Sequence, residues 1–485
     1  MKRIVYIIIA GILFLSSCGD SFLDETPSTS VDAATSIKTT NDIIDALNGL
    51  YSAAKSSSLF GRDVHVLGDL LADNAYISAS NYGRFLTEQA YRFSQNSGSA
   101  SGIWSQGYNV ILQANRIIYT ELTVPASQQV VVDRAKGEAY AWRALTNLVL
   151  VNFFGAPYTV NPDAPGIPVV TIPTYVTGPY VKPERQTVKE VYAHIFSDLE
   201  AAFGLISPTP IPSTYHDASS NYISKYAVKA IEARAALYKG DYAAARDAAL
   251  EVVNHGGFTL AATKSAFTSY WTAATPSTNK LETILELNMS ITSNLGSNGL
   301  DHMYNQEGYG DLLSAAEIYT LYSETDFRKS LVLDGIRKGN NQRAFVNNKY
   351  SNTANGDRDE VKILRYAEVI LTLAEGYAKT NDETNALKYL NQLAQLRDPG
   401  FAGYTSSGQQ LIDDIVNERR KELVFEGLRL FDLTRLNREI VRPAQQFSYP
   451  GYPLVSLTDH RRIQAIPQGE IDANPNIKQN PGYDD

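Results

Sequence analysis

Cysteine is almost absent from this sequence, with one residue in 485, and methionine and tryptophan are also scarce, with three each. A single cysteine cannot form an intramolecular disulfide, and it excludes zinc or iron–sulfur sites built from several cysteines. Basic residues are outnumbered, with 43 Lys and Arg against 52 Asp and Glu and a net charge of −9. This balance argues against a nucleic-acid-binding surface, because affinity for phosphate backbones depends on basic side chains. The 44% hydrophobic content excludes a wholly disordered chain.

The position of the one cysteine indicates an export signal. Lys2 and Arg3 precede an apolar run at 4–15, which is too short to span a bilayer. The run ends in Leu15-Ser16-Ser17-Cys18, which resembles the lipobox of bacterial lipoproteins, where the cysteine is acylated and becomes the first residue. The alternative is an ordinary signal peptide followed by a chance cysteine.

The lipobox predicts a protein held at a membrane by lipid. We expect a signal peptide at 1–17, a lipidated Cys18, and a flexible leash at 18–40 that is rich in Gly, Ser, Thr and Asp. Two or three acyl chains give lasting attachment, whereas one does not. Loss of 1–17 leaves 41 basic against 52 acidic side chains, a net charge of −11. The body would therefore not adhere to anionic lipid through its own surface.

Apolar residues recur at helical spacing along most of the remaining chain. Ile43, Leu47 and Leu50 mark the first helix, with Thr40 or Asn41 expected as its N-cap. The predicted helices cover 43–58, 104–120, 131–153 and 187–204, and another begins near 222. Seven prolines interrupt the stretch 155–186, which predicts an extended connector. Trp104 and Trp142 follow helical spacing and are expected in the core.

Two segments predict helical hairpins of the tetratricopeptide type. Residues 233–246 contain an alanine-rich helix, a Lys-Gly-Asp turn and a second alanine-rich helix, and 374–390 has related spacings with Pro399 beyond it. The alternative is a pair of unrelated amphipathic hairpins. We expect a mainly α fold, a tetratricopeptide-like helical-hairpin scaffold with long irregular loops and a few short strands, one of them at 283–287.

The C-terminal part carries the most specific motifs. Residues 417–435 read NERRKELVFEGLRLFDLTR and predict one helix, and Ile466-Pro467-Gln468-Gly469-Glu470-Ile471 and the Asn- and Pro-rich stretch 474–483 follow. Together with the Cys18 lipobox, these motifs resemble the SusD/RagB family of Bacteroidetes nutrient-uptake lipoproteins. The resemblance spans the mature chain. It implies one structural unit with an N-terminal region at 41–215, a helical-repeat segment at 216–265 and a C-terminal region at 266–485.

Charged residues of 418–429 stand at offsets of three and four, so opposite charges can pair along a helix, or pin that helix to the scaffold if they are buried. An acid pair for hydrolysis is the less favoured interpretation, because two acids on a salt-bridged helix lack the environments that separate their pKa values.

The resemblance implies a binding role at the cell surface. Family members capture an oligosaccharide, or less often a peptide, and pass it to a SusC-type TonB-dependent β-barrel in the outer membrane. We therefore expect a surface-exposed, lipid-anchored, non-enzymatic protein with no nucleic-acid partner, no cofactor and no metal. Residues 355–360 lack the full ligand pattern of a calcium loop. A surface glycoside hydrolase remains the third alternative, since it needs only two well-placed carboxylates.

Tyrosine is abundant, with thirty residues, and its ring and hydroxyl suit an amphipathic ligand such as a sugar. We place the candidate ligand-binding residues in loops, outside helical periodicity. The first group occupies a place similar to a ligand-contacting loop of starch-binding family members. The candidates are Asp73, Asn74, Tyr76, Asn81 and Tyr82 in the first group and Trp271, Tyr304, Asn305 and Tyr309 in the second. Arg84 and Arg92 could bind hydroxyls or carboxylates, although a solvated surface position is favoured.

Overall fold

The computed structural model describes residues 36–173, 182–209, 220–273, 281–353, 359–444 and 452–483. The signal peptide, Cys18 and the leash up to residue 35 lie outside the described residues, as do 354–358.

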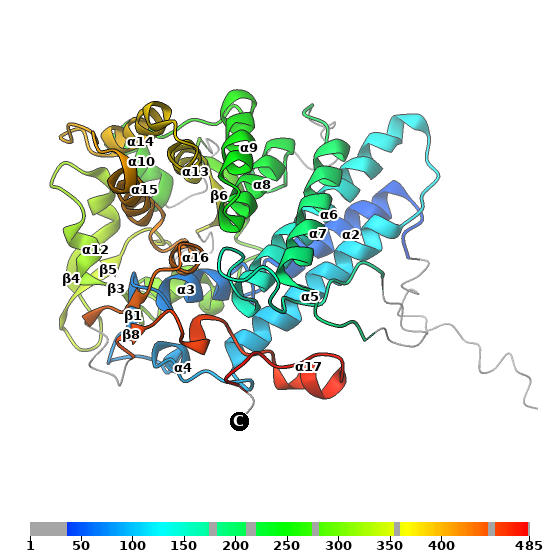
Figure 1. Ribbon diagram of the computed structural model, residues 1–485, viewed down its shortest axis with the longest axis horizontal. Coiled ribbons are helices and arrows are strands. Elements are labelled where there is room, and N and C mark those ends of the chain that lie inside the picture. Colours follow the sequence, from blue (N-terminus) through cyan, green and yellow to red (C-terminus); the bar gives the residue numbers. More distant parts are fainter. Residues whose placement is uncertain are drawn as a thin grey trace, which may run out of the picture.

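Four long helices form the N-terminal half and pack on one another in sequence order (Figure 1). They are α2 (Thr40–Ala54), α5 (Gly98–Tyr119), α6 (Ala126–Phe154) and α7 (Val188–Leu205). The N-cap of α2 is Thr39, not Thr40 or Asn41, because Thr39 and Asp42 form a capping box in which each side chain accepts from the other's backbone N–H. Trp104 and Trp142 are fully buried, as predicted.

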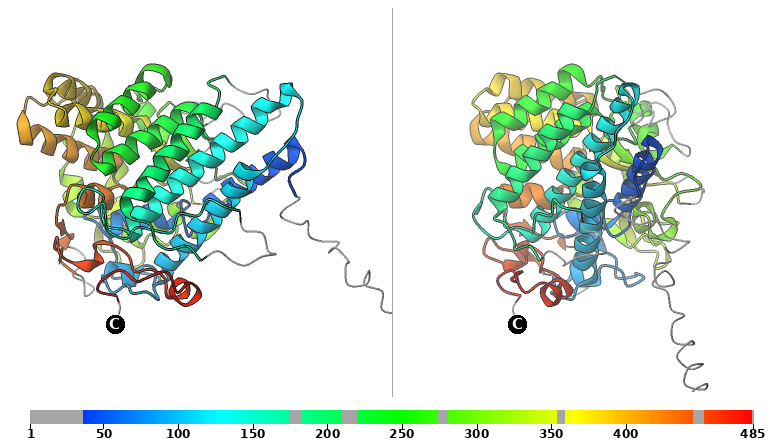
Figure 2. Two further views of the ribbon diagram at one scale, coloured as in Figure 1. Left: turned by 45° about the vertical axis from the view of Figure 1, so that its right-hand side comes forward. Right: turned by 90° about the vertical axis from the view of Figure 1, so that its right-hand side faces the viewer.

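Two helical hairpins follow, and both match the predicted repeats. The first pairs α8 (Lys225–Lys239) with α9 (Tyr242–His255), and the second pairs α13 (Tyr366–Lys379) with α14 (Glu383–Arg397). The hairpins stack through α9 and α13, beside the long helices in Figure 2. The stack needs a small residue at Gly376, where a Cβ atom would stand 2.8 Å from the Cβ of Arg246.

Short strands and helices fill the rest of the fold. A four-stranded antiparallel sheet has the order β1 (Ala75–Ile77), β3 (Leu312–Ser314), β5 (Arg343–Asn347) and β4 (Val332–Ile336). Two two-stranded sheets pair β2 (Thr283–Leu287) with β6 (Val361–Arg365) and β7 (Ile440–Val441) with β8 (Leu454–Val455). The mainly α prediction and the strand at 283–287 are confirmed.

The remaining helical elements connect these parts. They are α3 (Asp63–Leu70), α4 (Leu86–Gln89), α10 (Lys264–Thr272), η3 (Gly296–Asn298), α11 (Leu300–Tyr304), α12 (Ala316–Thr320), η4 (Phe327–Leu331), α15 (Gly408–Leu423), α16 (Arg429–Arg435), η6 (His460–Arg462) and α17 (Gln468–Ala473).

The prediction of one continuous helix over 417–435 is wrong. The chain leaves the helix after Leu423 and re-enters it at Arg429, because Phe425 and Gly427 adopt positive φ angles of 65° and 75°. Gly427 lies against α3, and a Cβ atom there would stand 2.5 Å from the Cα of His65. The break therefore lets the C-terminal motif contact the N-terminal half at backbone distance.

Most charges of this motif pair across the fold, whereas Glu418 with Lys421 and Asp432 with Arg435 follow the helix spacing. Glu422 contacts three buried arginines, at 3.1 Å from Arg365, 3.1 Å from Arg397 and 3.3 Å from Arg328. Burial alone would raise the pKa of Glu422, but the three guanidinium groups hold it well below its usual value.

Neighbouring residues extend this contact into a buried ionic network. Its members are acidic and basic side chains with almost no exposed surface, contributed by segments that are far apart in the sequence. They are Glu282, Asp326, Arg328, Lys349, Arg365, Arg397, Glu418, Glu422 and Glu426.

Replacing Arg365 with Met should lower the free energy of unfolding by about 3–5 kcal/mol, because carboxylates of Glu282, Glu422 and Glu426 would stay buried without their shared cation. Urea denaturation followed by circular dichroism measures this loss. The matched control is Arg343→Met, which breaks an exposed pair with Asp334 and should leave the transition unchanged. Equal transitions for the two variants would contradict a structural role for the network.

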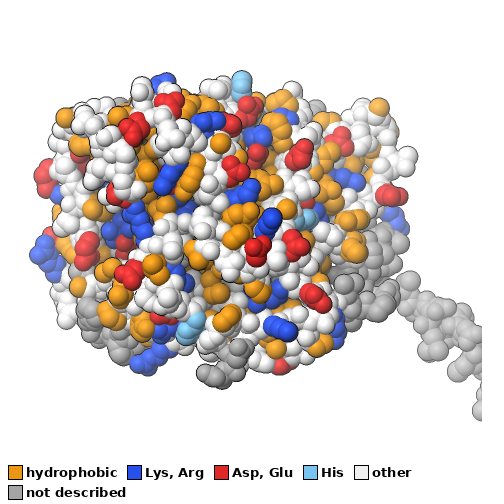
Figure 3. All heavy atoms as spheres, viewed as in Figure 1, with side chains coloured by type: hydrophobic (Ala, Val, Ile, Leu, Met, Phe, Trp, Pro, Cys, Tyr) orange, Lys and Arg blue, Asp and Glu red, His pale blue; other side chains and the backbone are white. Residues whose placement is uncertain are grey.

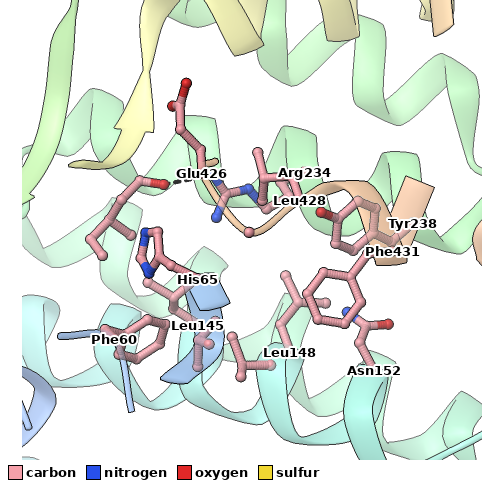
Figure 4. Close-up of a pocket in the computed structure, with 14 residues that line it drawn as sticks. Phe60, His65, Leu145, Leu148, Asn152, Arg234, Tyr238, Glu426, Leu428 and Phe431 are labelled. Carbon is pink, nitrogen blue, oxygen red and sulfur yellow. Dashed lines mark hydrogen bonds between the residues drawn. The ribbon is translucent and has the colours of Figure 1, made fainter. Parts of the chain in front are cut away.

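A small cavity of about 30 Å³ lies where α3, α6, α8 and the 426–431 segment meet (Figure 4). Apolar side chains form most of its wall, and His65 and Arg234 lie near one another on its polar side. Arg234 is bound by Glu368 and by the Ile363 carbonyl, whereas His65 contacts the Lys362 carbonyl through Nε2 at 3.2 Å. Burial lowers the pKa of His65 to about 4, so the imidazole is neutral at pH 7.

His65 should make the protein less stable in acid. Between pH 6.5 and about 4 the unfolded state binds a proton at this imidazole and the folded state does not, so the free energy of unfolding falls as the pH falls. Relative to a His65→Gln variant, the wild type should lose about 3 kcal/mol from pH 7 to pH 4. Urea titrations of both proteins at several pH values measure the difference. A difference that does not vary with pH would contradict the buried neutral histidine.

No described helix is both long and apolar enough to cross a membrane. The face in Figure 3 carries acidic and basic side chains interspersed, without a field of one sign.

Candidate ligand-binding site

Two loops that are distant in sequence lie at the same end of the four-stranded sheet. β1 pairs antiparallel with β3, and Ile77 lies opposite Leu312, so the chain after β1 and the chain before β3 lie side by side. The Ser78 N–H extends the pairing by donating to the Asp311 carbonyl at 2.9 Å. The pairing brings Tyr82 and Tyr309 together.

The two loops form a surface cluster of Tyr82, Arg84, His302 and Tyr309, called here the Tyr82 cluster. The rings of Tyr82 and Tyr309 have centroids 5.2 Å apart, and the Arg84 guanidinium lies 3.6 Å from the Tyr309 centroid. His302 meets the same tyrosine edge to face at 4.7 Å. Tyr82 is 66% exposed, whereas Tyr309 is half-buried beneath it. The cluster therefore presents an aromatic surface next to a cation.

An ion pair below the surface holds both loops in place. The Asp311 carboxylate accepts from the Tyr82 N–H at 3.1 Å and from Arg337 at 3.0 Å. Arg337 also donates to the Ser80 carbonyl and to the Gln306 side chain, at 3.0 and 3.1 Å. Burial raises the pKa of Asp311, and the Tyr82 N–H and Arg337 oppose that shift. The site is thus positioned before any ligand arrives.

Asn81 and Asn305 shape the loops of this site with their side chains. The Asn81 amide donates to the Ser78 carbonyl at 2.7 Å and accepts from the Gly83 N–H at 2.8 Å. Asn305 donates to the Tyr350 and Ser351 carbonyls. Both residues belong to the site region, where they fix turns.

Asp73 and Asn74 face the C-terminal motif. Asp73 forms a bidentate ion pair with Arg429, in which Nε and Nη2 of the arginine donate to the two carboxylate oxygens at 2.8 and 2.9 Å. Asn74 is fully buried, donates to Asp69 at 2.7 Å and accepts from Arg420 at 3.0 Å. These contacts occupy the polar atoms that sequence reasoning assigned to a ligand.

Three predicted aromatic residues lie in the core. Tyr304 has no exposed surface and stacks on Tyr350 at 5.8 Å, and Trp271 is 2% exposed. Tyr76 packs in the sheet against Leu313. Of the nine predicted residues, the structure brings Tyr82 and Tyr309 together at the surface, with Asn81 and Asn305 as turn residues beside them.

Sequence reasoning missed His302, Asp311 and Arg337, and it favoured a solvated position for Arg84. These residues belong to no motif. His302, Asp311 and Arg84 each stand two residues from a tyrosine in the sequence, whereas Arg337 has no tyrosine nearby and gives no such signal. Chemically, the Tyr82 cluster can stack on the apolar face of a ligand and donate hydrogen bonds from Arg84. Asp311 is bound by Arg337 and by a backbone N–H, so it is not placed as one member of an acid–base pair.

The fold and this loop site define a class: a helical-repeat scaffold that presents a surface for binding. The chain matches the model of the SusD family over residues 304–483 and a model described as "Starch-binding associating with outer membrane" over residues 21–237. The chain belongs to the SusD family.

Individual relatives match along the whole chain. SusD-like protein P2 of Formosa agariphila is 25% identical, and the alignment covers 100% of both chains. The crystal structure of a putative sugar binding protein from Bacteroides vulgatus superposes with a TM-score of 0.82 at 28% identity, covering 93% of this chain and 100% of the other. A SusD superfamily protein from Bacteroides thetaiotaomicron superposes with a TM-score of 0.81 at 27% identity, covering 91% and 100%.

Proposed function

We propose that this protein captures an oligosaccharide at the outer surface of the cell and delivers it to a SusC-type TonB-dependent transporter, without chemical conversion. The exposed ring of Tyr82, which packs against Tyr309 at a tilt of 56° and lies beside Arg84, carries this proposal. A sugar offers C–H groups on one face of its ring and hydroxyls at the edge. It can therefore lie on an aromatic surface while its hydroxyls accept hydrogen bonds from the guanidinium.

The family models support the location and the ligand class. One model describes starch binding in association with the outer membrane, and a structural neighbour is described as a putative sugar binding protein. The lipobox at Cys18 supplies the anchor in this proposal, and the leash lets the body reach a neighbouring barrel.

Changing Tyr82 and Tyr309 together to Ala should weaken glycan binding about 5- to 150-fold, because two aromatic contacts of about 0.5–1.5 kcal/mol each are lost and about 1.4 kcal/mol corresponds to tenfold. Affinity electrophoresis in gels that contain a panel of polysaccharides, followed by calorimetry on the retained glycan, measures the loss. Tyr119→Ala is the control, since this tyrosine is also exposed but lies at the end of α5. Unchanged affinity in the double variant would overturn the site. If immobilised peptides retained the protein and glycans did not, the assignment of the ligand as an oligosaccharide would be overturned.

The anchor and the transporter have a separate test. Wild-type cells should yield a mature chain that begins at an acylated Cys18 and co-purifies with a TonB-dependent barrel from mild detergent. The Cys18→Ala variant should lose the acyl groups, because no thiol remains to carry them. Mass spectrometry of the N-terminal peptide and of the co-purified proteins gives both results. A barrel-free preparation under conditions that preserve such complexes would count against delivery.

A further inference from the structure

A concave surface lies apart from the Tyr82 cluster and shares no lining residue with it. It is a cleft of about 260 Å³ between α2, the turn at 221–222 and the loop that follows β2. Its wall is polar, with the side chains of Ser52, Lys55 and Asn288 among those that line it, and Tyr222 contributes an aromatic ring. We call it the Lys55 cleft.

Lys55 brings a positive charge that no described carboxylate offsets. Its ammonium group donates to the Ser293 carbonyl at 3.1 Å, to the Ser293 hydroxyl and to the Asn288 carbonyl at 3.3 Å, and all three acceptors are neutral. Within the described parts of the chain, Lys55 makes no ion pair. Burial lowers the pKa of Lys55, which reflects the cost of holding this charge away from water without an anion.

The neighbouring groups are arranged as donors. Since the Ser293 hydroxyl oxygen accepts from Lys55, its own hydrogen is directed away from the ammonium and is polarised by it. The side chains of Ser52 and Asn288 are at the surface of the cleft and bind no other described side chain or carbonyl. A cation with three further donors around it is suited to an anion with several acceptor oxygens.

The aromatic part of the cleft is fixed in orientation. Tyr222 meets the Tyr51 ring edge to face, with centroids 5.3 Å apart and planes at 81°. Tyr51 is itself held by a hydrogen bond to the buried Glu138 and by one from the Ile223 N–H. The Tyr222 ring therefore stands at a set angle beside the polar groups, as a surface for an apolar ring face.

We propose that the Lys55 cleft binds an acidic sugar, with the carboxylate of a uronic acid accepting from the Ser293 hydroxyl next to the Lys55 charge and with its ring beside Tyr222. The remaining hydroxyls are placed near Ser52 and Asn288. This inference rests on the proposed function only in taking a glycan as the ligand, because it concerns a different place on the molecule and a charged class of sugar.

Two probes that differ only at C6 test the proposal: methyl β-glucuronide, which carries a carboxylate there, and methyl β-glucoside, which carries a neutral hydroxymethyl group. In NMR titrations of the whole mature protein, the glucuronide should bind and the glucoside should bind at least tenfold more weakly. Lys55→Gln keeps donors for the loop carbonyls but removes the charge, and should weaken glucuronide binding at least tenfold. Lys264→Gln, a charge change at an exposed position on α10, should have no effect.

Further variants separate the outcomes. The double Tyr82 and Tyr309 variant should retain glucuronide binding, so a failure of the Tyr82 cluster and a failure of the Lys55 cleft give different results. Ser293→Ala should weaken glucuronide binding. It serves as the second variant if Lys55→Gln does not fold. No glucuronide binding by the wild type, or binding that neither variant weakens, would overturn the proposal. Equal binding of triglycine would overturn the assignment to a sugar, because it shows that any carboxylate suffices.

Discussion

The buried ionic network around Glu422 is the constraint on which the rest of this fold depends. Glu422 contacts Arg328, Arg365 and Arg397, and these arginines also pair with other buried carboxylates, so the loss of any one member leaves a buried charge with too few partners, which costs several kcal/mol. The partners come from η4, from the end of β6 and from the end of α14. One set of charges therefore fixes the second helical hairpin, the central strands and the C-terminal motif relative to one another.

The consequences of this constraint reach the surface through backbone contacts. Directly after Glu426 the chain turns at Gly427, whose N–H donates to Asp69 of α3 at 2.7 Å. A Cβ atom on Gly68 would stand 1.9 Å from the Gly427 carbonyl oxygen, so the two segments touch without side chains between them. Arg429 then holds Asp73, two residues before β1. The loop that carries Tyr82 thus starts from a strand whose approach is fixed by the C-terminal motif, which explains why Asp73 and Asn74 have structural partners.

Sequence periodicity was sufficient for the long helices and the hairpins, because those elements bury one continuous stripe of side chains that is visible in the order of residues. It did not predict short helices such as α10 and α11. It failed at Phe425, because the motif reads as helical throughout, whereas the positive φ angles of Phe425 and Gly427 end the helix and allow the contact with α3. Sequence periodicity also did not separate exposed tyrosines from buried ones. Tyr82 and Tyr304 both lie outside long helices, but one is 66% exposed and the other is fully buried. Tertiary packing decides that difference, and no local pattern records it.

The segment between β2 and β3 contributes to both of the proposed binding surfaces. Its first residues line the Lys55 cleft, and its last residues form part of the Tyr82 cluster. Between them, the Asn298 carbonyl accepts from Arg62 at 3.4 Å, and α11 buries Met303 and Tyr304 in the core. Because the middle of this segment is anchored, ordering one end does not require the other end to move.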